Sequence, residues 1–141
     1  AGLAYVNALK PGHPAIFGTW PFVSDLRTGA MSGGSGEQAL LMAACAQMAE
    51  FYGLTGGVCA GMTDSKLPDA QAGYEKGYNY ALVAHSGANL MYEAAGMHAS
   101  LLGFSLESLV PHRAALAPAL DAEIRGRFPV RLPETAVVRG G

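Results

Sequence analysis

The sequence predicts an α/β domain built on parallel strands. Three short apolar segments, residues 15–20, 57–62 and 88–92, alternate with longer segments whose apolar residues recur at helical spacing. The connections are short, so each strand–helix–strand unit predicts neighbouring parallel strands joined by a right-handed crossover. The strands are almost wholly apolar, as expected when both sheet faces are covered. This pattern alone fits a generic α/β domain, and a small flavodoxin-like sheet would share the same order of elements.

The first unit has clear boundaries. The strand at residues 15–20 ends before Pro21, which lacks the N–H needed for sheet pairing. After a loop rich in glycine and serine, Ser35 has the features of a helix N-cap, and Gln38 three positions later predicts a capping box. The helix should then run to a stop at Gly53.

The second unit repeats this arrangement. Its strand, residues 57–62, precedes Pro68, which suits the first turn of the next helix, and Asp69 lies near the positive end of that helix. The helix should run to about His85. The third strand, residues 88–92, follows.

The organisation of the chain beyond the third strand is less regular. A further helix is expected over residues 96–102, and residues 113–125 fit one more. We therefore divide the chain into an α/β domain, residues 1–109, and an atypical C-terminal tail, residues 110–141.

Composition indicates a densely packed protein. Half of the 141 residues are hydrophobic, 14% are charged and the formal net charge is -2, which argues against nucleic acid or an anionic membrane as the main partner. No apolar run approaches the roughly 20 residues that span a bilayer, and the sequence shows no secretory signal, so we expect a cytoplasmic protein. Cys45 and Cys59 lie in apolar surroundings and are expected to be buried free thiols. The chain begins with Ala1, so we expect the start of the reading frame to be missing.

A carboxylate follows each predicted strand: Asp25, Asp64 and Glu93. Parallel strands end at one edge of a sheet, and active sites of parallel α/β proteins are built at that edge. For Asp25 and Asp69, capping a helix fits the pattern as well as a catalytic role does. For Asp64 and Glu93 we favour a catalytic role.

Aromatic residues accompany these acids. Trp20 and Phe22 lie near the first, and Tyr92 lies beside the third. Aromatic ring faces attract a methylated ammonium group, and a carboxylate adds opposite charge without needing an N–H donor. Phe17 is better interpreted as ordinary core, while Trp20 is the best candidate for a cation cage.

Other polar motifs carry weaker signals. The loop at residues 33–36 could cradle a phosphate at a helix N-terminus, but it lacks a P-loop lysine and does not fit GxGxxG. His13, His85, His98 and His112 show no metal-ligand spacing, so no metal site is expected. His98 could reach the edge with the acids or could simply be a hydrogen-bonded helix residue.

Three motifs in order resemble the trimethylamine methyltransferase family. They are LRTGAM at residues 26–31, GMTDSKLPDAQAGYEKG at residues 61–77, and GANLMYE at residues 87–93 with Gly96-Met97 after it. The resemblance covers about residues 1–109. It implies a (β/α)8 TIM barrel. This chain would hold about three of the βα units, from the C-terminal part, and would therefore be an incomplete barrel. It also implies transfer of a methyl group to the Co(I) of a corrinoid (cobalamin) carried by a cognate corrinoid protein.

The chain departs from the family pattern in two places. Val110-Pro111-His112-Arg113 interrupts the continuation expected after residues 106–109, so the tail to Gly141 is expected to come from a truncated or altered frame. Members that act on trimethylamine carry pyrrolysine, and we place the corresponding position within residues 64–66 of this chain. The sequence contains no pyrrolysine.

The missing pyrrolysine bears on the substrate. A quaternary ammonium releases a neutral amine directly when Co(I) attacks a methyl carbon, so binding and orientation could suffice, whereas trimethylamine needs activation. The resemblance therefore favours a quaternary amine such as a betaine. Lys66 could pair with a betaine carboxylate, or equally with Asp64 as a surface ion pair.

These inferences give a set of expected roles. The expected catalytic residues are Asp64, Lys66 and Glu93; the expected substrate-binding residues are Trp20, Phe22, Tyr92, Asp25 and Gln71; the expected corrinoid contacts are Ser65 and His98. The expected partners are a small methylated amine, a corrinoid protein and, when complete, further copies of the chain. The alternatives are a non-catalytic fragment of such a barrel and, more weakly, a phosphate-binding α/β domain.

Overall fold

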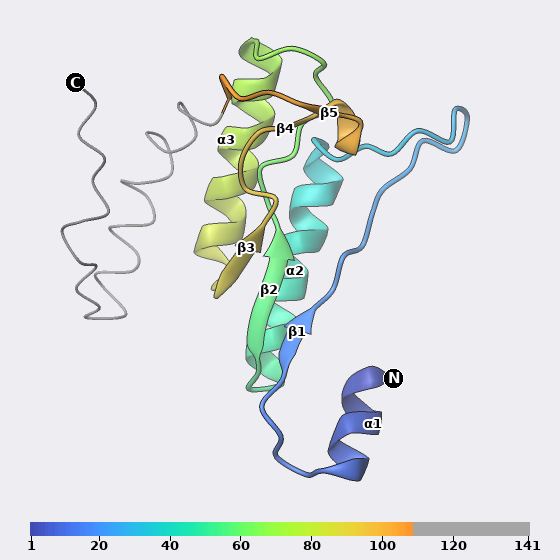
Figure 1. Cartoon of the computed structure of the whole chain (residues 1–141), viewed down its shortest axis with the longest axis vertical. Helices are drawn as coiled ribbons and strands as arrows, with labels where there is room; N and C mark the ends of the chain where they lie inside the picture. Colours follow the sequence, from blue (N-terminus) through green and yellow to red (C-terminus); the bar gives the residue numbers. More distant parts are fainter. Residues whose placement is uncertain (109–141) are drawn as a thin grey trace, which may run out of the picture.

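A computed structural model describes residues 1–108 of the chain, and its centre is a three-stranded parallel sheet (Figure 1). The strands β1 (Ile16–Gly18), β2 (Thr55–Cys59) and β3 (Leu90–Tyr92) pair in the order β1-β2-β3. The prediction of three adjacent parallel strands is confirmed. Strand β2 begins and ends earlier than predicted. It stops before Gly61 because the chain turns there, and the φ of Gly61, 84°, lies in the left-handed region.

Helix α2 (Gly36–Phe51) follows the first strand and begins as predicted. The Ser35 side chain accepts a hydrogen bond from the N–H of Gln38 at 3.2 Å. The predicted capping box is incomplete, however. The buried Gln38 amide instead contacts the segment after β1, accepting from the N–H of Val23 at 3.0 Å and donating to the carbonyl of Pro21 at 2.7 Å. Gln38 therefore fastens the segment after β1 onto the start of α2.

Helix α3 (Ala70–His85) follows the second strand. Asp69 is its N-cap and accepts a hydrogen bond from the N–H of Ala72 at 2.9 Å. The prediction that Pro68 lies in the first turn is wrong, since it precedes the cap. The helix ends at His85, followed by Ser86 as its C-cap.

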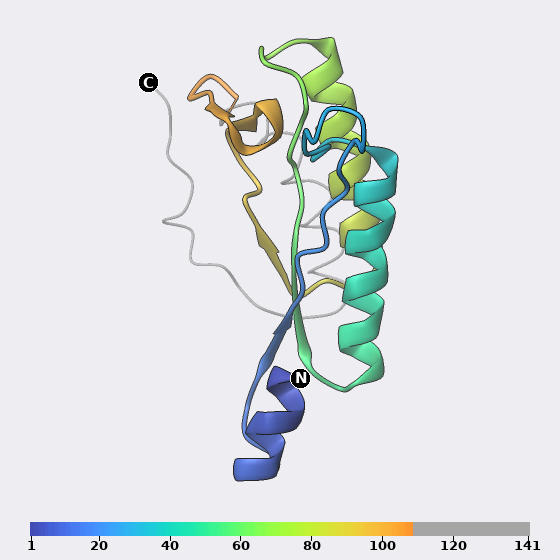
Figure 2. The same ribbon diagram turned by 90° about the vertical axis from the view of Figure 1, so that its right-hand side faces the viewer.

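Both helices cover one face of the sheet, as Figure 2 shows. Small residues of α2 allow a close approach: a Cβ on Gly56 would lie 2.8 Å from Cβ of Ala49. The core between helices and sheet includes Met42, Val58, Met62, Tyr80 and Val83.

An antiparallel hairpin closes the carboxyl edge of the sheet. It pairs β4 (Met97–His98) with β5 (Gly103–Phe104) through the turn η1 (Ala99–Leu101). The helix predicted over residues 96–102 is therefore wrong. All three turn residues have positive φ, which an α-helix does not allow, and the N–H groups of Ala99 and Ser100 donate to carbonyls of the loop after β2.

Helix α1 (Gly2–Leu9) was not predicted and lies beyond the amino end of β1, away from the sheet (Figures 1 and 2). The tail at residues 110–141, with its possible helix at 113–125, lies outside the described residues. Within residues 1–108, no helix is long and apolar enough to cross a membrane.

Candidate active site

The carboxyl ends of the three parallel strands bring distant segments to one edge of the sheet. Residues 19–22 follow β1, Thr63 and Asp64 follow β2, and Glu93 follows β3. The hairpin β4–β5 lies over this edge (Figure 1). Polar side chains cannot stay unpaired within the apolar strands, so they gather where the strands stop.

Asp64 joins the loops that follow all three strands. Its Oδ2 accepts from the Ser32 hydroxyl at 2.8 Å, and its Oδ1 accepts from the N–H of Gly34 at 3.0 Å and from the Ser100 hydroxyl. Three donors on one carboxylate leave little capacity for a ligand. The N–H of Gly34 is also engaged and is not free for the phosphate that we considered for this loop.

Glu75 of α3 fixes the backbone at Asp64 by a hydrogen bond, and it was not identified from the sequence. Its Oε2 accepts from the N–H of Asp64 at 2.8 Å and from the Thr63 hydroxyl at 2.5 Å, while its Oε1 accepts from Gln71 at 2.8 Å. A Cβ on Gly34 would lie 2.8 Å from the backbone nitrogen of Asp64 and 2.2 Å from Glu75 Oε2, so a side chain at this position would displace the loop at Asp64. The only sequence signal for these Glu75 hydrogen bonds was the i, i+4 spacing of Gln71 and Glu75, which places both on one helix face.

Two tyrosines of α3 fasten the other loops. The Tyr78 hydroxyl donates to the carbonyl of Gly34, after β1, and the Tyr80 hydroxyl donates to the carbonyl of Ala94, after β3. Burial raises the pKa of both hydroxyls, so they stay protonated donors. Helix α3 thus supports the whole edge, a role that the sequence did not indicate.

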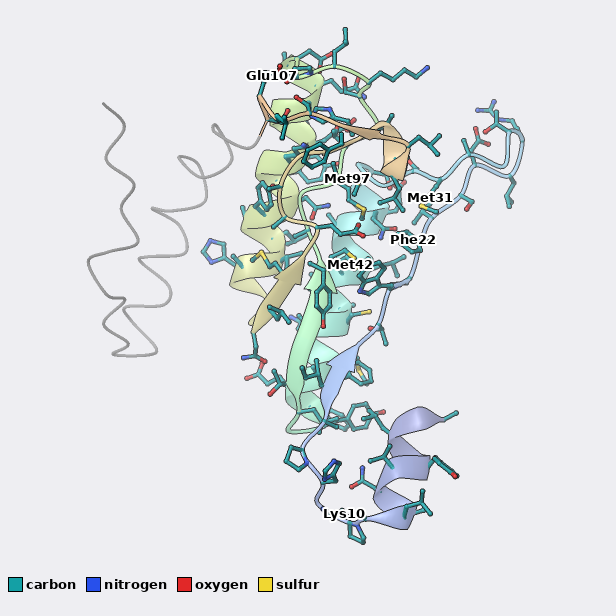
Figure 3. All side chains as sticks on the ribbon, in the orientation of Figure 1. Lys10, Phe22, Met31, Met42, Met97 and Glu107 are labelled. Carbon is teal, nitrogen blue, oxygen red and sulfur yellow. The ribbon has the colours of Figure 1, made fainter. Side chains whose placement is uncertain are left out.

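The structure brings Trp20, Phe22 and Tyr92 into one aromatic cluster. The rings of Trp20 and Tyr92 have centroids 5.6 Å apart at 48°, and those of Trp20 and Phe22 lie 6.2 Å apart at 85°. Trp20 is 43% exposed, so the cluster is open to solvent. Phe22 also packs, with Met97 of β4, against the buried cluster that contains Met42 (Figure 3).

Glu93 differs from Asp64 because one of its oxygens has no donor. Oε2 is buried and has no hydrogen-bond partner among the described residues, and the backbone φ of Glu93 is 54°. Burial, and secondarily the charge of Glu93, raises the pKa of Cys59 to about 12. The hydroxyl of Thr19, next to Trp20, is likewise buried without a partner.

Asp25 belongs to the segment between β1 and α2, which projects away from the sheet as an arm (Figure 1). The arm is closed by a bridge between Ser24 and Met31. A hydrogen bond from the N–H of Arg27 lowers the pKa of Asp25, and the Arg27 side chain forms the one ion pair found within residues 1–108, at 3.5 Å. Lys66 is exposed and is not paired with Asp64.

Ser65 is buried, at 5% exposure. Its hydroxyl oxygen lies 2.9 Å from Oδ1 of Asp69 and 3.0 Å from the carbonyl oxygen of Leu67, two acceptors that share its one proton, and these contacts shape the turn before α3. These bonds give Ser65 a structural task in addition to the corrinoid contact that we predicted.

His98 is also buried, at 2% exposure. Its Nε2 lies 2.6 Å from the Ser108 hydroxyl and 3.4 Å from Nζ of Lys76, and its Nδ1 lies 3.3 Å from the carbonyl of Ser65. Burial lowers the pKa of Lys76 to about 8, and burial followed by the Lys76 charge lowers the pKa of His98. The imidazole thus joins the hairpin to α3.

The described residues contain no group of three or more histidine, cysteine, aspartate or glutamate side chains that could hold a metal ion. Cys45 and Cys59 are both free, and Cys59 is fully buried. What the edge offers is an aromatic cluster, one carboxylate oxygen without a donor, and loops fixed by hydrogen bonds.

Comparison with known proteins identifies a matching family. A family model described as trimethylamine methyltransferase matches residues 1–120, which include every residue of the edge. The chain belongs to the trimethylamine methyltransferase family. The match extends to residue 120, past residue 109 where we expected the resemblance to end.

Individual relatives in the trimethylamine methyltransferase family are similar over most of this chain. It is 37% identical over 126 residues to a glycine betaine methyltransferase of Desulfitobacterium hafniense (strain Y51), covering 89% of the chain and 24% of that protein. It is 39% identical over 110 residues to the trimethylamine methyltransferase MttB of Methanosarcina thermophila, covering 78% and 23%. The chain therefore spans about a quarter of the length of these curated relatives.

Proposed function

We propose that the protein acts in transfer of a methyl group from a methylated amine, with a quaternary amine of the betaine type preferred, to a corrinoid protein. The observation that carries this proposal is the aromatic cluster of Trp20, Phe22 and Tyr92. Glu93, whose buried Oε2 has no hydrogen-bond donor among the described residues, follows Tyr92 directly in the chain. Family membership supports the reaction class, since relatives are named for trimethylamine and for glycine betaine.

The aromatic cluster suits a permanent cation. A methylated ammonium cannot donate an N–H, so ring faces within about 6 Å and a nearby carboxylate supply its attraction. Trp20 presents a partly exposed ring, and Tyr92 precedes Glu93 directly in the chain. Asp64 is less suited to contact the ligand because its oxygens already accept from Ser32, Gly34 and Ser100.

The fold supports assignment to a (β/α)8 barrel. Within residues 1–108, the helices that pack on the three parallel strands lie on one face of the sheet, as in the wall of such a barrel (Figure 2). In a barrel, the other face would turn inward, and the carboxyl edge would form the mouth at which active sites lie. The aromatic cluster lies at that edge.

The residues of this chain bind and orient the amine in the proposed reaction. The corrinoid, carried by its own protein, supplies the Co(I) nucleophile that accepts the methyl group. The open side of Trp20, with 43% of the residue exposed, fits access by a second protein at this edge. Because no pyrrolysine is present, a quaternary amine, which departs as a neutral tertiary amine, fits better than trimethylamine.

The test is methyl transfer from a panel of amines to reduced cobalamin by the purified protein. Glycine betaine or another quaternary amine should be demethylated, and trimethylamine should not. Trp20→Leu should weaken binding by roughly 0.5–2 kcal/mol, the range of one cation–π contact. The matched control is Phe51→Leu, an exposed aromatic residue of α2 outside the cluster, which should change nothing.

Turnover of trimethylamine would show that the preference for a quaternary amine is wrong, while leaving the family assignment intact. Equal effects of Trp20→Leu and Phe51→Leu on binding would remove the aromatic cluster from the substrate site.

A further inference from the structure

The ring of Tyr92 lies over the backbone of Gly57 on the neighbouring strand. A Cβ placed on Gly57 would lie 2.2 Å from Oη of Tyr92, 2.7 Å from its Cζ and 2.9 Å from its Cε2. These separations are shorter than any van der Waals contact. The ring therefore occupies the space that any side chain at position 57 would need.

This contact is on the face of the sheet that the helices leave uncovered. Gly56 faces α2, where a Cβ would meet Ala49, so Gly57 faces the opposite way. Tyr92 pairs in register with Cys59, and its ring reaches back along β2 toward Gly57. The uncovered face is also the one that would line the interior of the proposed barrel.

The glycine at position 57 is needed for space and not for backbone conformation. Its φ is not in the left-handed region, unlike that of Gly61. Glycine weakens a strand interior, and a common reason for it there is the close approach of another group. At Gly57 that group is the Tyr92 ring.

Gly18 of β1 lies next to Gly57 in the sheet but is not crowded by Tyr92 in the same way. It pairs in register with Gly57, yet a Cβ on Gly18 would lie 3.5 Å from Oη of Tyr92, an ordinary contact. An alanine is therefore tolerated at position 18 and not at position 57 without moving the ring.

The position of the Tyr92 ring also decides its contact with Trp20. The two centroids are 5.6 Å apart, and a tyrosine ring is rigid, so a methyl group under it must move the whole ring. We propose that Gly57 is a specificity-determining position, because its missing side chain lets Tyr92 form a wall of the aromatic site against Trp20. The consequence for ligand binding rests on the proposed function, in which this site receives a methylated ammonium group.

The first test uses Trp20 as a reporter, since it is the single tryptophan of the chain. Gly57→Ala should shift the emission of Trp20 and raise its quenching by acrylamide, because the Tyr92 ring no longer covers it. Gly18→Ala should leave both unchanged. Equal behaviour of the two variants would overturn the proposal whatever the protein binds.

The second test is a double-mutant cycle on binding of glycine betaine and tetramethylammonium. Gly57→Ala should weaken binding by about 2- to 30-fold, the range of one cation–π contact. In a Tyr92→Ala background, Gly57→Ala should have no further effect, because the residue acts through the ring. Additive losses would overturn the proposal.

Folding of the variants gives an independent readout. If Gly57→Ala does not fold, the double variant Gly57→Ala/Tyr92→Ala should, because the clash is gone; failure of both would overturn the proposal. Lack of ligand binding by the wild-type protein would instead contradict the proposed function, and the Trp20 emission would still decide the relation of Gly57 to Tyr92.

Discussion

Glu75 and Asp64 are joined by a hydrogen bond from the backbone N–H of Asp64 to the Glu75 carboxylate. Glu75 Oε2 accepts from the N–H of Asp64 at 2.8 Å, and the Asp64 side chain then accepts from loops that follow β1 and β3. A residue of α3 thereby fixes the residue that organises the edge. Neither carboxylate is paired with a cation in the described part of the chain.

Glu75→Gln should destabilise the protein by roughly 1.5–3 kcal/mol, the range for hydrogen bonds to a charged group. The amide keeps one acceptor oxygen but loses the charge that holds Thr63 and Asp64. Urea unfolding measures the change, and Glu50→Gln, at an exposed position of α2, is the matched control. Equal stability of the two variants would show that the Glu75 bonds contribute nothing.

Glu93→Gln and Asp64→Asn should have opposite signatures. Glu93 has a buried oxygen without a donor, so replacing it by a neutral amide should leave stability unchanged or raised while weakening binding of glycine betaine. Asp64→Asn removes the charge that three donors share and should lower stability by roughly 1.5–3 kcal/mol. Urea unfolding and calorimetric titration separate the two. A stable Asp64→Asn variant that fails only in binding would contradict our division of roles.

Lys76 should make stability rise with pH just above neutrality. Its pKa is about 8 in the folded chain against an ordinary value of 10.5, so in this window the unfolded chain holds a proton that the folded chain has lost. The slope should approach about 1.4 kcal/mol per pH unit, and Lys76→Met should abolish it.

The measurement is urea unfolding of both proteins between pH 8 and 9. Below this window the neighbouring His98 titrates, since its pKa lies under 6.5; above it, the raised pKa of Cys59 acts in the opposite direction. Taking wild type minus Lys76→Met cancels the contribution of Cys59, and measuring above the range in which His98 titrates keeps its contribution small. A flat difference would mean that the Lys76 ammonium is not desolvated.

Cys59 should resist alkylation in the native protein. It is fully buried, and with a pKa of about 12 roughly one thiol in ten thousand is ionised at pH 8. Cys45, which is half-buried, should react first with iodoacetamide when followed by mass spectrometry. Glu93→Gln should lower the pKa of Cys59, because the Glu93 charge contributes to raising it. Faster reaction at Cys59 than at Cys45 would contradict this burial.

Local patterns in the sequence were sufficient for the elements that depend on neighbouring residues. The three strands, the N-cap Ser35, and the ends of α2 and α3 follow from apolar spacing and side-chain capping within a few positions. Parallel pairing followed from the short connections, and the family followed from three motifs. These features could be predicted because each is decided by residues close together in the chain.

The features that depend on hydrogen-bond partners far apart in the chain were decided by the tertiary structure. Residues 96–102 became a hairpin because Ala99 and Ser100 donate to the loop after β2, a partner more than thirty positions away. Each of the three predicted strands is followed by a carboxylate, yet in the structure Asp64 has three donors, Asp25 has an arginine neighbour, and Oε2 of Glu93 has no donor among the described residues. A carboxylate's availability depends on which donors the fold brings to it, and spacing along the chain does not encode that.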